Sequence, residues 1–275
     1  RLSALVSDPL LDGGRRIGSF IGGVAALVVL WIRRSMDESL SESHLKAIRA
    51  GEDRTAGSLK ALFTQHWRPL LLVFLITAGG TVAFYTYSVN APAIVKSTFG
   101  DDRALTATWI NLIGLILLLL LQPVGGIISD HVGRKPLLIF FGVGGVLYTY
   151  VLLTYLPKTT SPLSAFALVA VGYIILTGYT SINAIVKAEL FPADIRALGV
   201  GLGYALANSV FGGTAPLLYQ ASKSAGHVTW FIVYVTVVIG ISLLVYIFGL
   251  KNKAVTVLDR EQGSAWGVPA SSSPR

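Results

Sequence analysis

Polar side chains recur inside several long apolar stretches of this chain, mostly three or four residues apart. A helix would present side chains at that spacing on one face. Hydroxyl and amide groups can hydrogen-bond a carboxylate or ketone oxygen, so the sequence predicts a cavity for a small polar molecule. The candidate lining residues are Thr81, Tyr85, Ser88, Asn111, Tyr179, Asn183, Tyr204 and Asn208, with Arg16 near the external end of another stretch. The alternative is that these groups bond neighbouring helices, each bond contributing ~0.6 kcal/mol.

Two short charged segments between apolar stretches hold a second set of candidates. These are Asp130, Gly133, Arg134 and Lys135 in one segment and Glu189 and Arg196 in the other. An acidic group is unfavourable at a helix C-terminus, so Asp130 is expected to pair with Arg134 or Arg196. Such pairs would form a latch between helices that opens during a conformational change. The alternative is that each charge is solvated, in which case an exposed pair contributes only ~0–1 kcal/mol.

The sequence lacks residues that several classes of function require. The chain has no cysteine, and its four histidines lie outside the apolar stretches. It contains neither a His-Glu-x-x-His nor a Gly-x-Ser-x-Gly motif, so we predict no enzyme, no catalytic residue and no metal. The net charge is +8, but the basic residues lie between apolar stretches and form no reading face, which argues against nucleic acid as a partner.

The composition indicates a membrane protein. Of 275 residues 53% are hydrophobic and 13% are charged, against roughly 25% charged in soluble domains. Seven runs contain no Lys, Arg, Asp or Glu: 17–32, 69–95, 105–128, 136–156, 163–186, 198–221 and 228–250. Six of them reach the ~20 residues that a spanning helix needs. The first is shorter and could instead lie along the membrane surface. The expected fold is an all-α, polytopic transmembrane bundle.

The basic residues also predict an orientation. If the segment around Arg134 is cytoplasmic, the cytoplasmic segments hold fifteen Lys and Arg residues and the external loops hold four. We therefore expect the N-terminus outside and the C-terminus in the cytoplasm. The expected organisation is an external stub (1–16), a first span (17–32), a cytoplasmic linker (33–68), a six-helix half-domain (69–250) and a disordered cytoplasmic tail (251–275).

Two motifs carry a resemblance to a known family. Residues 126–135, Gly-Ile-Ile-Ser-Asp-His-Val-Gly-Arg-Lys, resemble the signature loop of the major facilitator superfamily, with His131 where Arg or Lys is usual. Residues 189–199 resemble a Glu-x-Phe-Pro-x-x-x-Arg-x-x-Gly segment of the same superfamily, in which Pro192 is expected to break the helix. Segments 33–39, 78–87, 179–183 and 199–213 are similar to its metabolite:proton symporter family.

The resemblance implies the sixth helix and the C-terminal six-helix half of a transporter, with helices one to five missing as in a fragment. It implies proton-coupled symport of a dicarboxylate such as α-ketoglutarate across the bacterial inner membrane, driven by the proton gradient without a cofactor. The expected partners are the organic acid, the proton, the lipid bilayer and the missing N-terminal half. The alternatives are a symporter of another organic acid, shikimate or an osmolyte, and a non-transporting truncated membrane protein. Because no run contains a charge, charge recognition is expected mainly in the missing half.

Overall fold

The computed structural model describes residues 15–35, 59–100 and 104–250, and the chain divides into two compact units, 1–53 and 54–275. In the first unit α1 (Arg15–Ser35) covers the first predicted run, 17–32. The expected stub, most of the linker and the tail fall on residues 1–14, 36–58 and 251–275, which lie outside the described residues.

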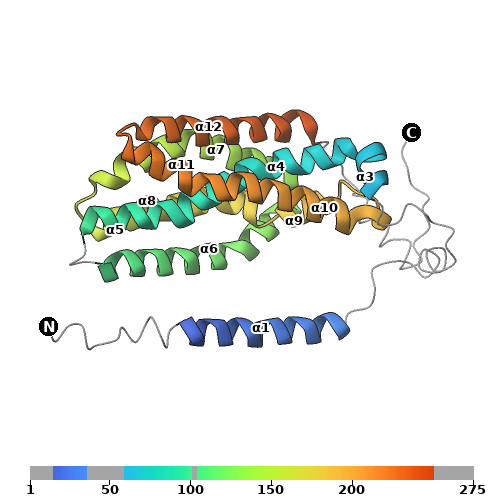
Figure 1. Ribbon diagram of the computed structural model, residues 1–275, viewed down its shortest axis with the longest axis horizontal. Helices are drawn as coiled ribbons and strands as arrows, with labels where there is room; N and C mark the ends of the chain where they lie inside the picture. Colours follow the sequence, from blue (N-terminus) through green and yellow to red (C-terminus); the bar gives the residue numbers. More distant parts are fainter. Residues whose placement is uncertain (1–14, 36–58, 101–103, 251–275) are drawn as a thin grey trace. The chain divides into compact units, whose positions relative to one another are not determined.

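The second unit is a bundle of helices that run side by side along the horizontal axis of Figure 1. The apolar runs that the sequence predicts in this unit form helix, with a turn at residues 181–182 that interrupts the run 163–186. The elements are α3 (Leu59–Gln65), α4 (Trp67–Tyr85), η2 (Thr86–Asn90), α5 (Ala91–Phe99), α6 (Ala104–Val132), α7 (Arg134–Tyr155), η4 (Leu156–Lys158), α8 (Pro162–Thr180), α9 (Asn183–Ala188), α10 (Ala193–Ala207), η5 (Asn208–Gly212), α11 (Gly213–Ser224), α12 (Val228–Leu244) and η6 (Val245–Gly249).

Five described helical stretches are long and apolar enough to cross a membrane. They are Trp67–Phe99, Leu105–Val132, Arg134–Lys158, Pro162–Ala188 and Val228–Gly249. The stretch from α10 through η5 to α11 is also continuous, but Asn208, Thr214 and Gln220 make it more polar. The spans expected at 17–32 and 198–221 therefore stay predictions. Large apolar side chains such as Leu119, Leu147 and Trp230 are exposed, as suits a surface in contact with lipid.

The packing order brings helices from distant parts of the sequence together. α12 packs against α4 and α7, α8 packs against α6 and α7, and α10 packs against α4. The Tyr246 hydroxyl donates to the carbonyl of Ile76 at 3.0 Å, and the Ser242 hydroxyl donates to the carbonyl of Leu75 at 2.6 Å, so polar contacts join η6 and α12 to α4. This arrangement places α4 between α10 and α12 and leaves it in contact with α8.

Two interruptions shape the ends of the helices that matter for function. Gly133 has φ 93°, a conformation that glycine adopts readily, and it turns the chain between α6 and α7. Pro192 precedes α10 in an extended conformation, and α9 ends before it at Ala188. The prediction that Pro192 breaks the helix is confirmed.

Candidate functional site

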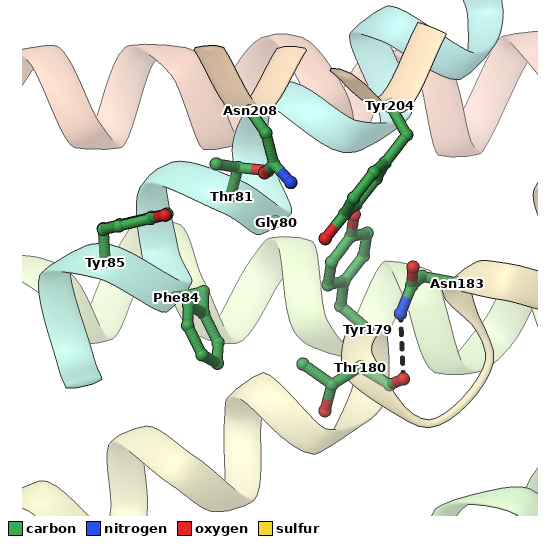
Figure 2. Close-up of a pocket in the computed structure, with 9 residues that line it drawn as sticks. All are labelled: Gly80, Thr81, Phe84, Tyr85, Tyr179, Thr180, Asn183, Tyr204 and Asn208. Atoms are coloured by element: carbon green, nitrogen blue, oxygen red, sulfur yellow. Dashed lines mark hydrogen bonds between the residues drawn. The ribbon is translucent and has the colours of Figure 1, made fainter. Parts of the chain in front are cut away.

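Three parts of the bundle enclose a polar pocket of about 180 Å³. Figure 2 shows side chains from α4, from the α8–α9 segment and from the α10–η5 segment converging on it. We call this space the polar pocket; its lining residues are Gly80, Thr81, Phe84, Tyr85, Tyr179, Thr180, Asn183, Tyr204 and Asn208. Six of the nine predicted cavity residues therefore lie together. Their hydroxyl and amide groups can donate and accept hydrogen bonds, which suits a small polar solute.

One wall of the polar pocket joins α4 to the α10–η5 segment. The Thr81 hydroxyl donates to the Asn208 side-chain oxygen at 2.8 Å. This bond leaves the Asn208 amide hydrogens available to a solute, because only the oxygen of the amide is engaged with Thr81. Asn208 begins the π-helical segment η5, a type of irregularity that is frequent at functional sites.

The opposite wall depends on a glycine. A Cβ atom at Gly80 would overlap the Tyr179 ring, so the missing side chain lets α8 approach α4 closely. Tyr179 is 4% exposed, and its ring also packs against Phe141. Gly80 thus fixes where the Tyr179 hydroxyl lies at the edge of the polar pocket.

A buried lysine lies directly behind the lining. Lys187 is 1% exposed, and its ammonium donates to the Asn183 side-chain oxygen at 3.0 Å and to the Tyr179 hydroxyl at 3.2 Å. The same ammonium lies 4.5 Å from the centroid of the Tyr204 ring, within cation–π distance. All three contacts are lining residues of the polar pocket. Lys187 is not among the predicted site residues, although the spacing of Tyr179, Asn183 and Lys187 at i, i+4 and i+8 places the three on one helical face.

Three predicted cavity residues lie elsewhere. Ser88 is part of η2, and its hydroxyl bonds the carbonyl of Phe84. Asn111 contacts the Tyr173 hydroxyl at 3.4 Å and borders a different cavity, which Lys96 also lines. Arg16 belongs to α1 in the other unit, and its side chain lies outside the described residues. On α6, Gln122 contacts a residue that lines the polar pocket, because its side-chain amide donates to the Thr180 hydroxyl at 3.0 Å.

The predicted latch has a different partner from the one expected. Among the described residues, Arg134 Nε and Glu189 Oε1 form an ion pair at 2.8 Å, whereas Asp130 is exposed. The expected pairing of Asp130 with Arg134 or Arg196 is therefore wrong for this conformation. Arg134 Nε–H does not point along the line to the carboxylate, so the contact is a close ion pair rather than an aligned hydrogen bond.

The remaining basic residues of these segments bind backbone carbonyls. The Lys135 ammonium donates to Ile247 at 2.6 Å and to Leu250 at 3.0 Å, where it caps the last helical stretch. Arg196 donates to Ala188 at 3.0 Å and to Phe191 at 3.2 Å, across the break that Pro192 makes. In the described part of the chain, no cluster of His, Asp and Glu could hold a metal ion.

Sequence comparison decides the family. The sequence model described as Major Facilitator Superfamily matches residues 16–216. The chain belongs to the major facilitator superfamily. It is a multi-pass membrane protein, and its resemblance to this superfamily is confirmed.

Curated relatives within the superfamily are transporters rather than enzymes. The chain is 39% identical to the alpha-ketoglutarate permease of Escherichia coli K12 over 236 residues, which are 86% of this chain and 53% of the permease. It is 26% identical to a citrate-proton symporter of Salmonella typhi over 216 residues, 78% of this chain and 48% of that protein. It is 23% identical to a proline/betaine transporter of Escherichia coli K12 over 250 residues, 86% of this chain and 49% of that protein.

These relatives are longer than the chain, which spans about half the length of each. No solved structure gives a significant match.

Proposed function

We propose that this chain forms the substrate-binding C-terminal half of a proton-coupled symporter for a small dicarboxylate, such as α-ketoglutarate. The observation that carries the proposal is the polar pocket, in which three helical segments present hydroxyl and amide groups inside an apolar bundle. Such groups are costly in lipid and serve a solute that crosses the membrane. The similarity to alpha-ketoglutarate permease, which covers most of this chain, supports the substrate class.

The proposed partner is an N-terminal six-helix half that closes the polar pocket from the other side. Superfamily transporters consist of two such halves, and alternating access follows from rocking one half against the other. We place the protein in the bacterial inner membrane with the C-terminus of this chain in the cytoplasm, as the distribution of basic residues favours.

Uptake measurements test this proposal. Cells that express the complete protein containing this chain should accumulate radiolabelled α-ketoglutarate, and a proton uncoupler should abolish the accumulation. Excess unlabelled citrate, shikimate, proline and betaine should compete poorly. Cells that carry the empty vector give the background.

The outcomes separate the alternatives. Strong competition by citrate or shikimate would reassign the substrate to another organic acid, and strong competition by betaine would reassign it to an osmolyte. The similarity to a citrate-proton symporter and to a proline/betaine transporter makes these the relevant competitors. No uptake of any of these solutes would favour a non-transporting membrane protein.

A further inference from the structure

Lys187 is buried, and the described contacts of its ammonium are with uncharged groups. Its ammonium contacts the Tyr179 hydroxyl, the Asn183 side-chain oxygen and the face of the Tyr204 ring. Among the described residues no carboxylate lies within ion-pair distance of it, since Glu189, two residues further along, faces Arg134. A buried charge without a counter-ion is destabilising, and inside a membrane bundle an ionisable residue usually serves function.

The ammonium is separated from the polar pocket by its own contacts. Each of Tyr179, Asn183 and Tyr204 lines the pocket, and Figure 2 shows the Tyr204 side chain reaching from α10 toward the side where Tyr179 and Asn183 lie. A lysine carries three N–H donors, and the hydrogen bonds to Tyr179 and Asn183 use two of them. A rotation of the Lys187 side chain would move its ammonium toward a bound solute. A rotation of the half-buried Asn183 side chain would expose the ammonium to the solute.

We infer that Lys187 supplies the positive charge that binds a carboxylate group of the transported solute. This inference rests on the proposed function. It places a charge-recognition residue in this chain, whereas the sequence predicted charge recognition mainly in the missing half. The carboxylate lies against Lys187, Tyr179 and Asn183, and the rest of the solute reaches toward Thr81 and Asn208 across the pocket.

The same geometry selects organic anions over zwitterionic osmolytes. A quaternary ammonium ligand is recognised by the exposed face of aromatic rings. At this site the Lys187 ammonium already lies against one face of the Tyr204 ring, 4.5 Å from its centroid, and 5.5 Å from the centroid of the Tyr179 ring. A betaine-like cation would therefore meet a like charge where it needs an open aromatic face.

Binding to the purified complete protein in detergent tests the inference, with radiolabelled α-ketoglutarate as the probe. The neutral variants Lys187→Gln and Lys187→Met should bind it roughly 10- to 100-fold more weakly, as expected for the loss of a charge-assisted hydrogen bond. Their melting temperatures should equal or exceed that of the wild type, because removal of an uncompensated buried charge does not destabilise the fold. The matched control is Lys158→Gln, since Lys158 also lies over a tyrosine ring, that of Tyr155, but is exposed at the end of η4; this variant should bind like the wild type.

Three outcomes of this experiment would count against the inference. Wild-type affinity in both Lys187 variants would overturn the inference and leave the proposed function intact. A large drop in melting temperature that accompanies the weaker binding would also overturn it, because Lys187 would then be structural. Absence of binding of the probe to the wild-type protein would count against the proposed function itself, and this inference would fall with it.

Discussion

At the scale of single residues, the polar pocket depends on a side chain that is absent. Gly80 lies where the Tyr179 ring crosses α4, and no larger residue fits without moving that ring. Tyr179 in turn accepts a hydrogen bond from Lys187. The position of a buried charge is therefore set by a glycine on a different helix.

We predict that Gly80→Ala lowers the affinity for α-ketoglutarate by about tenfold or more, since the displaced tyrosine leaves Lys187 without one of its partners; such a loss corresponds to ~1.4 kcal/mol. Gly201→Ala on α10 is the matched control, because nothing lies near the added methyl group there. Replacing a helical glycine with alanine stabilises a helix by roughly 0.5–1 kcal/mol, so Gly201→Ala should keep its affinity and melt slightly higher. Binding and thermal unfolding of both variants check the prediction, and equal affinities for the two would contradict it.

At the scale of elements, the α9 segment connects the polar pocket to the two charged segments that contain Arg134 and Glu189. Asn183 and Lys187 on α9 face the lining, and Glu189 follows at the end of the same helix and pairs with Arg134 at the start of α7. A solute that pulls on Lys187 would move Glu189 as well, because only one residue separates them. We therefore expect the Arg134–Glu189 pair, rather than a pair that includes Asp130, to act as the predicted latch.

We predict that Arg134→Gln and Glu189→Gln each lower the rate of α-ketoglutarate uptake several-fold, with normal amounts of protein in the membrane. The double variant should be no worse than either single variant, because both changes break the same pair. Asp130→Asn should have the smaller effect, since Asp130 is exposed and the pair does not include it. The uptake rates of the wild type, the two single variants and the double variant form a double-mutant cycle, and Asp130→Asn is the control. Additive losses would show that the two residues act separately.

At the scale of the whole molecule, the apolar runs predicted where the helices lie, and Pro192 predicted the break before α10. The spacing rules also identified most of the polar pocket, because its residues repeat along regular helix. Ser88 was misplaced since it lies in the π-helical η2, where the wider turn rotates side chains away from the face that Thr81 and Tyr85 share. Asn111 was misplaced since α6 packs on α8 and α5 rather than on α4.

Long-range partners could not be obtained from spacing. The pairing of Arg134 with Glu189 depends on how α7 meets the α9 segment, and no local pattern distinguishes it from a pairing with Asp130. Lys187 directly follows the apolar run 163–186, so the run itself predicts no buried charge, yet helix continues to Ala188 and carries the Lys187 side chain into the bundle. For this reason the sequence predicted that charge recognition lies mainly in the missing half.

The orientation of the bundle in the membrane can be tested directly. The chain has no cysteine, so His131→Cys and Lys158→Cys each introduce one thiol in this part of the protein. Both positions are exposed, and they lie beyond opposite ends of α7. A membrane-impermeant thiol reagent added to intact cells should label residue 158 and not residue 131. Labelling of both or of neither would contradict the topology, and labelling after membrane permeabilisation is the control for reactivity.

If the polar pocket binds the transported acid, the acid should protect a single cysteine that is placed in the pocket. Thr180 lines the pocket and is half-buried, so Thr180→Cys places a thiol there with little change in volume. The rate of alkylation by a small permeant maleimide should fall several-fold when α-ketoglutarate is present and should be unchanged by betaine. Alkylation of His131→Cys, outside the pocket, should be insensitive to both solutes. If α-ketoglutarate leaves the Thr180→Cys rate unchanged at concentrations that saturate uptake, the acid binds elsewhere and the account is wrong.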